Sequence, residues 1–430
     1  MKQIRVMVFP CGSEVGLEIC NSLKDISFIE LYGASSTADH GKFVFENYIE
    51  GIPYITAPDF LEKMNQVLDE HHIDYLYPAM DQVVDVLSED RDALHAQLIA
   101  PCHDSVHVCR SKQRTYQRLD GLDFMPKTYQ DPREVKEYPV IIKPSEGYGA
   151  KGFRILHTQD ELLRALEESG QENVICEYLE GEEYTIDCFT DRHGVLQYTS
   201  CRNRNRIRNG ISVNSSIQPL DEKIETIAKE IMGRIPMRGA WFFQLKRNGL
   251  GQYKLMEVAT RIAGTMCVQR ARGVNMPLLS LFDWMGYDVE ITPQFEEVEV
   301  DRALYNVFRV GKVFRHVYLD YDDTLVVHGR VNCNLMRYLY QCLNQGIPLT
   351  VVSKHDGDLI ADMKAYHISP DLFQEIIHIG RDQRKCDVIC PEEGSLLIDD
   401  SFAERKEMAQ AHGMTTIGVD GVDALIDYRI

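Results

Sequence analysis

The chain has 430 residues and a formal net charge of −20. Its 44% hydrophobic content is typical of folded globular proteins and excludes wholesale disorder, and its length predicts several domains. The acidic balance makes nucleic acid and anionic membranes poor partners, and no apolar run approaches the roughly 20 residues that span a bilayer. The 12 cysteines include no Cys-x-x-Cys pair, so we expect reduced, mostly buried thiols in a cytoplasmic protein.

Short β-rich runs alternate with helical patterns along the first hundred residues. The expected elements are, in chain order, a strand at 4–9, a helix at 15–23, a strand at 28–35, a helix at 61–72 and a strand at 73–79. Such alternation is typical of a parallel sheet with crossover helices, so this part of the chain is predicted to be α/β.

The pattern becomes mixed between about residues 110 and 295. A predicted strand at 138–144 runs into the glycine-rich segment SEGYGAKGF, and residues 173–189 read as strand, hinge and strand. Residues 239–261 read as a hairpin that turns at Asn248-Gly249. The charged stretch 291–306 is a candidate linker to a further unit, although its alternation of Glu and Val also fits an edge strand.

Several side chains of the middle segment suit a nucleotide. Lys112 opens a helical segment, and Lys143 ends a strand directly before the glycine-rich loop, whose backbone N–H groups suit a polyphosphate. Glu177 and Glu183 flank the apolar hinge Tyr178-Leu179. The backbone of such a hinge can read an adenine edge, and a carboxylate a few residues later can hold ribose hydroxyls.

Other side chains of the same segment suit a metal ion and an anion. Gln244 and Glu257 are expected on facing strands of the hairpin, where both can reach one hard cation through oxygen. Arg261 follows on the strand face of Glu257 and can neutralise a phosphoryl group or bind a carboxylate. Each residue alone fits an ordinary surface position, but the ordered set is far more specific.

Taken in order, these residues resemble the ATP-grasp superfamily, most closely its carbamoyl-phosphate-synthase-like branch, over about residues 1–295. The resemblance implies a Rossmann-like α/β domain at 1–105 and an ATP-grasp domain at 106–300. It implies that ATP is bound by two lysines, the glycine-rich loop, the hinge and a ribose-binding glutamate, namely Lys112, Lys143, Ser145, Gly147, Gly149, Gly152, Glu177, Tyr178, Leu179 and Glu183. It also implies that Gln244 and Glu257 hold Mg²⁺ and that Arg261 steadies the acyl-phosphate transition state.

Two stretches are unusual for that superfamily. The common Glu-x-Asn-x-Arg pattern reads Glu257-Val258-Ala259-Thr260-Arg261, and Ala259 cannot ligate a second magnesium ion. The basic run RNRNRIRNG at 202–210 is either a solvated charge cluster or a loop over phosphates or an anionic substrate. In so acidic a chain, a local basic cluster favours the second interpretation.

A third unit of alternating strands and helices begins at about residue 314. Strands are expected at 317–323, 348–353, 395–400 and 415–420, with a helix from about Leu335. Carboxylate pairs end two of these strands, at Asp320 with Asp322 and at Asp399 with Asp400. Because open α/β sheets bind ligands at strand ends, the pairs predict a magnesium site with a nucleophile and a proton donor.

This order resembles the haloacid dehalogenase (HAD) superfamily of phosphatases, over a predicted domain at 311–430. Its Asp-x-Asp-x-Thr pattern matches Asp320 to Thr324, with Asp323 at the usual glycine position. The resemblance implies that Asp320 forms an aspartyl-phosphate, Asp322 is the general acid/base, Ser353 and Lys385 hold the phosphate, and Asp320, Asp322 and Asp399 bind Mg²⁺. Lys354 is a rival for the lysine role but is expected to point away. The short gaps between motifs leave no room for a large cap domain.

The sequence thus predicts a multidomain α/β and α+β enzyme with two activities. The first is an ATP- and Mg²⁺-dependent ligase that joins a carboxylate to an amine or similar nucleophile through an acyl phosphate. The second is a Mg²⁺-dependent phosphomonoesterase. Two alternatives stay open for the ATP-grasp half, a small-molecule kinase and a nucleotide-sensing module that regulates the phosphatase. The expected partners are small molecules, and a homo-oligomer is compatible with the sequence.

Overall fold

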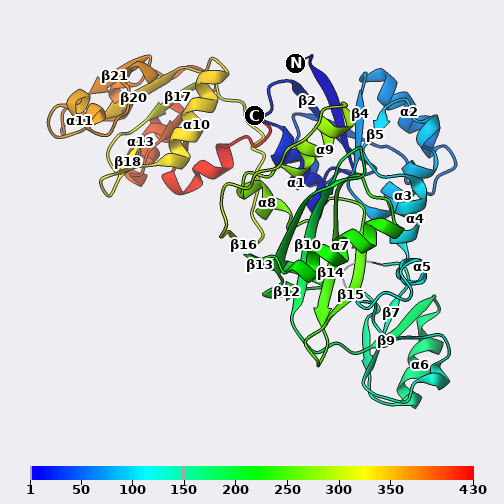
Figure 1. Ribbon diagram of the computed structural model, residues 1–430. Helices are drawn as coiled ribbons and strands as arrows, with labels where there is room; N and C mark the ends of the chain where they lie inside the picture. Colours follow the sequence, from blue (N-terminus) through cyan, green and yellow to red (C-terminus); the bar gives the residue numbers. More distant parts are fainter. Residues whose placement is uncertain (1, 148–150) are drawn as a thin grey trace. The chain divides into compact units, whose positions relative to one another are not determined.

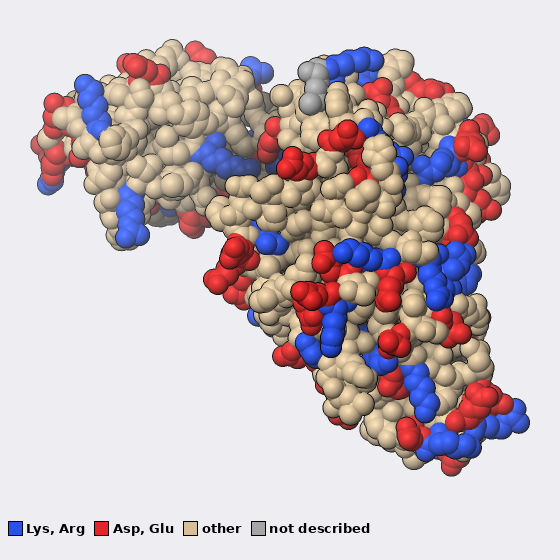
Figure 2. Space-filling view, viewed as in Figure 1, with Lys and Arg blue, Asp and Glu red and all other residues tan. Residues whose placement is uncertain are grey.

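The computed structural model describes residues 2–147 and 151–430. These residues form two compact units, Met1–Leu304 and Tyr305–Ile430. No helix in the described part of the chain is long and apolar enough to cross a membrane. On the face drawn in Figure 2, acidic side chains are interspersed with Lys and Arg, so the excess negative charge is not gathered in one patch there.

The first unit begins with a five-stranded parallel sheet of order β3-β2-β1-β4-β5. Its strands are β1 (Ile4–Phe9), β2 (Ile29–Ser35), β3 (Asn47–Glu50), β4 (Tyr75–Pro78) and β5 (Gln97–Leu98). The helices of this part are α1 (Glu14–Leu23), α2 (Phe60–Glu70) and α3 (Asp81–Glu89). The α/β prediction for the first hundred residues is confirmed as a Rossmann-like sheet, and β1 has the predicted bounds.

Two short helices lead from this sheet into the rest of the unit. They are α4 (His103–Arg110) and α5 (Lys112–Arg118), and α4 packs on α3. Ser111 separates them and caps α5, because its hydroxyl accepts a hydrogen bond from the Arg114 N–H. The cap ends one helix and starts the next within a single residue, which places Lys112 at the first position of α5.

A four-stranded antiparallel sheet follows, of order β6-β9-β7-β8. Its elements are β6 (Thr128–Tyr129), β7 (Val140–Pro144), β8 (Arg154–Leu156), α6 (Gln159–Ser169) and β9 (Asn173–Glu177). Figure 1 shows β7, β9 and α6 as a small lobe at one end of the first unit. The lobe has a hydrophobic core of its own that includes Val140, Ile142 and Leu162.

The largest sheet has seven strands, of order β12-β13-β11-β10-β14-β15 with β16 paired to β13. Its strands are β10 (Glu183–Thr190), β11 (Leu196–Asn203), β12 (Arg206–Arg208), β13 (Ile211–Gln218), β14 (Gly239–Arg247), β15 (Tyr253–Ala259) and β16 (Glu299–Asp301). The accompanying helices are α7 (Glu222–Arg234), α8 (Cys267–Ala271) and α9 (Met276–Trp284). The predicted hairpin is confirmed as β14 and β15, in which Gln244 lies directly opposite Glu257.

Residues 291–306, predicted as a candidate linker, include a strand of the first unit. Residues 299–301 form β16, which pairs antiparallel with β13, and Arg302 makes an ion pair with Glu14 at 3.1 Å. The edge-strand interpretation therefore holds for this stretch, because its alternating Glu and Val residues complete a sheet of the first unit. The chain leaves that unit after Leu304.

The second unit contains a five-stranded parallel sheet of order β21-β20-β17-β22-β23. Its strands are β17 (His316–Leu319), β20 (Leu349–Ser353), β21 (Glu375–His378), β22 (Ser395–Ile398) and β23 (Thr415–Ile417), with a small hairpin of β18 (Val326–Val327) and β19 (Arg330–Val331). The helices are α10 (Cys333–Asn344), α11 (Leu359–Ala365), α12 (Lys385–Val388) and α13 (Phe402–His412). Two hydrophobic clusters, built entirely from residues of this unit, form its core.

We predict that residues 305–430 fold without the rest of the chain, because both hydrophobic clusters and all sheet pairings of this unit are internal to it. The isolated fragment should be soluble and should unfold in one cooperative transition by circular dichroism. Residues 1–304 should likewise be stable, whereas residues 1–298 should melt at a lower temperature because they lack β16. An unfolded 305–430 fragment beside a stable full chain would contradict the prediction.

Candidate active sites

One cavity of about 330 Å³ in the first unit brings together most of the residues predicted to bind a nucleotide. Its wall is drawn from α5, from both antiparallel sheets and from the segment that joins them. The predicted residues in that wall are Lys112, Lys143, Gly147, Glu177, Tyr178, Leu179, Glu183, Gln244 and Glu257. We call this space the first cavity.

Both predicted lysines line the first cavity. Lys143 is 8% exposed, and its Nζ donates hydrogen bonds to Tyr116 Oη at 2.7 Å and to the Met256 carbonyl at 3.0 Å. Burial lowers the pKa of Lys112, an effect that Glu257 and other neighbouring charges modify. A buried amine that faces a cavity gains much from a bound anion, because water screens the charge pair poorly there.

The glycine-rich segment is described in part. Gly147 lines the first cavity, whereas Gly149 lies outside the described residues. Gly152 has φ +77°, and a Cβ there would come within 2.7 Å of Pro144 Cγ, so only glycine fits without strain. Ser145 does not line the cavity: its hydroxyl lies 2.7 Å from that of Ser111, and its carbonyl accepts a hydrogen bond from the Lys112 N–H. Ser145 thus fastens the start of the glycine-rich segment to α5.

The hinge between β9 and β10 supplies another part of the wall. Tyr178 and Leu179 both line it, together with apolar side chains that can enclose a flat base, namely Ile141, Phe153, Ile207, Leu255 and Met256. Glu177 Oε1 accepts a hydrogen bond from the Lys127 N–H at 2.8 Å. Glu183 Oε1 lies 2.9 Å from Nε of Arg204, so the carboxylate predicted to hold ribose is already paired with a cation.

Gln244 and Glu257 sit side by side in the wall of the cavity. They are directly opposite residues on β14 and β15, which brings their Cβ atoms to roughly 5 Å of one another. Their amide and carboxylate oxygens are donors of the kind that Mg²⁺ prefers, so the residues present fit a magnesium ion. Ala259, two residues beyond Glu257, is buried and offers no side-chain oxygen.

Arg261 is held by a partner that the sequence does not reveal. Its Nε and Nη2 atoms donate to the two carboxylate oxygens of Asp81, both at 2.7 Å, and its Nη1 donates to the Ile262 carbonyl at 2.9 Å. Burial acts to raise the pKa of Asp81, but the Arg261 guanidinium outweighs it and holds that pKa below its usual value. The two residues are 180 positions apart in the chain, and no spacing pattern links them.

A second cavity, of about 390 Å³, adjoins the first and shares Lys112, Gln244 and Glu257 with it. Arg261 lines this second cavity rather than the first. The wall carries an excess of cations, namely Arg110, Lys112, Arg202, Arg204, Arg261 and Arg302, over the acids Glu14, Asp81 and Glu257. Thr185 also belongs to the wall and is buried, and its hydroxyl has no hydrogen-bond partner among the described residues. A polar, anionic ligand matches such a wall.

Some arginines of the basic run at 202–210 line a cavity and others are exposed, so each of the two interpretations holds for part of the run. Arg202 is buried and donates to Asp187 at 2.8 Å and to the Thr265 hydroxyl at 2.6 Å. Arg202 and Arg204 both line the second cavity, whereas Arg206 pairs with Asp301 on the neighbouring β16 and Arg208 is exposed. Ile207 lines the first cavity and Gly210 lines both cavities, so residues along the whole run contribute to the cavity walls, whereas two of its four arginines do not.

The strand ends of the second unit bring together a lysine and three carboxylates. Lys385 Nζ lies 2.8 Å from Asp320 Oδ1 and 2.6 Å from Asp399 Oδ2. Oxygens of Asp320, Asp399 and Asp400 all lie within 4.8 Å of one another, so the three fit a hard cation such as Mg²⁺. Burial raises the pKa of Asp399 to about 6 and also raises that of Asp320, while Lys385 opposes both effects.

Asp322 lies apart from this carboxylate group. Both of its oxygens are 3.0 Å from Nδ1 of His355, a contact that no spacing pattern in the chain indicates. Asp400, which forms the second carboxylate pair with Asp399 in the sequence, belongs to the group instead of Asp322. Ser353 is buried at the end of β20 and its hydroxyl has no hydrogen-bond partner among the described residues. Lys354 pairs with Glu404 at 2.6 Å, as expected of a lysine that points away.

Residues 169–303 match the family model described as ATP-grasp in the biosynthetic pathway with Ter operon. The carbamoyl phosphate synthase large chain of Clostridium beijerinckii is 23% identical over 325 residues, which are 68% of this chain and 29% of that protein. The chain thus spans less than a third of the length of this curated relative.

Solved structures with a similar fold include enzymes of several kinds. The biotin carboxylase domain dimer of 2-oxoglutarate carboxylase from Hydrogenobacter thermophilus, in complex with MgADP and bicarbonate, has a TM-score of 0.57 at 18% identity and covers 68% of this chain and 72% of its own. N5-carboxyaminoimidazole synthetase from Staphylococcus aureus, complexed with ADP, has a TM-score of 0.55 at 14% identity, with 68% and 79% covered. L-amino acid ligase from Bacillus licheniformis has a TM-score of 0.53 at 16% identity, with 65% and 74% covered.

These matches agree with the topology and with the residues gathered in the first cavity. The chain therefore contains an ATP-grasp fold preceded by a Rossmann-like domain, as in the carbamoyl-phosphate-synthase and biotin-carboxylase-like members of the ATP-grasp superfamily.

Proposed function

We propose that the first unit is an ATP-dependent ligase that activates a carboxylate as an acyl phosphate and transfers the acyl group to an amine or similar nucleophile. The observation that carries the proposal is the pair of adjoining cavities that share Lys112, Gln244 and Glu257. Two ligands bound side by side can exchange a phosphoryl group without leaving the protein. The MgADP and ADP complexes of the similar structures support a nucleotide in the first of them.

In this proposal ATP occupies the first cavity. The apolar side chains around the Tyr178-Leu179 hinge enclose adenine, Glu183 faces the ribose, and Lys112 and Lys143 bind the phosphates. Gln244 and Glu257 hold Mg²⁺, which neutralises phosphate charge when bound. The terminal phosphate then points toward the second cavity, whose wall begins at the same Lys112 and Glu257.

The acid substrate occupies the second cavity. Its carboxylate oxygen attacks the terminal phosphorus, the bond to ADP breaks, and an acyl phosphate forms. The nucleophile then attacks the acyl carbon, and phosphate leaves. Of the five N–H groups of Arg261, three are engaged by Asp81 and the Ile262 carbonyl, so two remain to stabilise the negative charge that develops on the substrate.

The Glu257→Gln variant should lose roughly 100-fold or more of the ADP formation supported by a carboxylate and an amine, because a neutral amide holds the metal ion less tightly. The measurement is a coupled ADP assay over a panel of carboxylates and amines. Glu225→Gln, on the surface of α7, is the matched control and should be unaffected. Full activity in Glu257→Gln would rule out the assigned metal ligand, and a phosphorylated rather than a condensed product would identify a kinase.

The Asp81→Asn variant should lower kcat for ADP formation by roughly tenfold or more, because Arg261 loses its charged partner and its fixed orientation. Affinity for ATP should change little, since neither residue lines the first cavity. Binding of a fluorescent ATP analogue, measured beside the ADP assay, separates the two effects. An equal loss of ATP binding would show that the ion pair supports the whole fold and does not specifically orient Arg261.

We further propose that the second unit is a Mg²⁺-dependent phosphatase of the haloacid dehalogenase type. The contact that carries this proposal is Lys385 bridging Asp320 and Asp399 at the ends of β17 and β22. Asp320 attacks the phosphorus, an aspartyl-phosphate forms, and the alcohol leaves with a proton from Asp322. Water activated by Asp322 then attacks the phosphorus and restores the Asp320 carboxylate. Fusion in one chain favours related substrates, such as a phosphorylated amine that is ligated and then dephosphorylated.

The Asp320→Asn variant should lose hydrolysis of a generic aryl phosphate by roughly 10³-fold or more, because an amide is a poor nucleophile. Asp322→Asn should lose most of the activity. Asp356→Asn, which alters an exposed pair with Arg381, is the matched control. ADP formation by the first unit should persist in all three. Hydrolysis that persists in a folded Asp320→Asn protein would exclude the aspartyl-phosphate.

A further inference from the structure

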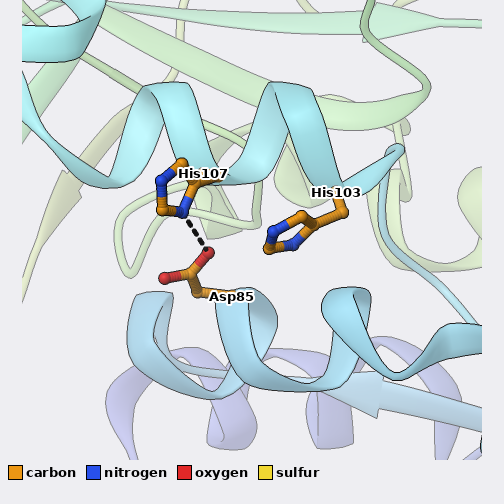
Figure 3. A group of neighbouring side chains, drawn as sticks. All are labelled: Asp85, His103 and His107. Carbon is orange, nitrogen blue, oxygen red and sulfur yellow. Dashed lines mark ion pairs between the residues drawn. The ribbon is translucent and has the colours of Figure 1, made fainter.

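Three metal-ligating side chains converge from two helices at a place that neither proposed activity uses. Asp85 lies on α3, and His103 and His107 lie four residues apart on one face of α4 (Figure 3). One ligand atom from each residue lies within 4.8 Å of the others. None of the three is among the residues that line the first or the second cavity.

The geometry of the group is that of ligands rather than of a hydrogen-bonded pair. Asp85 Oδ1 and His107 Nδ1 are 3.5 Å apart, which is too long for a strong hydrogen bond. Asp85 Oδ1 is nonetheless buried and has no hydrogen-bond partner among the described residues. Two ligand atoms that each lie about 2.1 Å from a tetrahedral zinc ion are about 3.4 Å apart, so the observed separation suits joint coordination.

The surroundings keep His103 close to α3. The Ser88 hydroxyl donates to the Asp85 carbonyl at 2.8 Å and lies 3.1 Å from His103 Nδ1, which holds the imidazole against α3. The rings of His103 and His107 have centroids 5.4 Å apart. Because the His107 side chain is 47% exposed, an ion can enter from solvent and keep a water molecule as a fourth ligand.

We propose that Asp85, His103 and His107 bind a divalent transition-metal ion of the zinc type, which cross-links α3 to α4. Two imidazoles and one carboxylate favour such an ion over Mg²⁺, which prefers oxygen ligands. The site is apart from the proposed magnesium sites. It joins the two helices whose ends reach the second cavity, since Asp81 begins α3 and Arg110 ends α4.

The test is a Zn²⁺ titration of the full-length, untagged, reduced protein against a chromogenic indicator. The protein carries Asp320→Asn, because this change weakens metal binding by the group of Asp320, Asp399 and Asp400 in the second unit. Co²⁺ absorption reports the ligand geometry. We expect one equivalent to bind, and His103→Gln, His107→Gln and Asp85→Asn each to weaken that binding at least tenfold. His95→Gln is the matched control, because His95 is also paired with a carboxylate, Asp69, at 2.8 Å.

Zn²⁺ should also raise the melting temperature of the parent protein and of His95→Gln but not of His107→Gln. Binding that is unchanged in His107→Gln, or equal losses in His107→Gln and His95→Gln, would overturn the proposal. The absence of a tightly bound equivalent of Zn²⁺ in the parent protein would also overturn the proposal. No nucleotide is present in these titrations, so their outcome is independent of the proposed ligase and phosphatase activities.

Discussion

The second cavity is built around the ion pair between Arg261 and Asp81, which both line it. Asp81 begins α3 in the Rossmann-like part, whereas Arg261 follows the last strand of the β14–β15 hairpin. The pair joins these two parts at the wall of the second cavity. A hydrophobic cluster supports the same junction, with Val6 and Val8 on β1 and Phe242 and Ala259 on the hairpin. Since one core serves both parts, they form a single compact unit.

Several other basic side chains that line the second cavity are also paired with carboxylates. Arg202 is paired with Asp187, Arg204 with Glu183 and Arg302 with Glu14. Cations held by fixed carboxylates are oriented before a ligand arrives, so little conformational entropy is lost when it binds. The wall still carries more basic than acidic side chains, which explains how so acidic a protein can hold an anion.

Local sequence patterns predicted much of the fold. The runs of β1 and β2, the β14–β15 hairpin and the strand ends at Asp320 and Asp399 follow from hydrophobic periodicity and turn residues, which act over a few positions. The ordered lysines, glutamates and glycines also predicted most of the first cavity, because most of them lie at or near the ends of such elements. These features are encoded within short stretches of chain.

The missed features are contacts between distant residues. Asp81 with Arg261, and Asp322 with His355, depend on how elements pack, and no spacing within either segment indicates them. The group of Asp85, His103 and His107 arises in the same way, since the sequence shows only two histidines four residues apart. The sequence leaves two interpretations open for residues 299–301 for a related reason. Alternating Glu and Val residues suit both a charged linker and an edge strand, and only the pairing with β13 distinguishes them.

The place where the chain leaves the first unit has a consequence for how such proteins diversify. Arg302 lines the second cavity, and the unit ends only two residues later at Leu304. A recombination event that exchanged the downstream segment at residue 300 would also exchange Arg302, which is one residue of the wall of the second cavity. Breakpoints beyond Leu304 would leave that wall intact. Arg302 and the attached unit are therefore inherited together or separately according to a shift of a few positions.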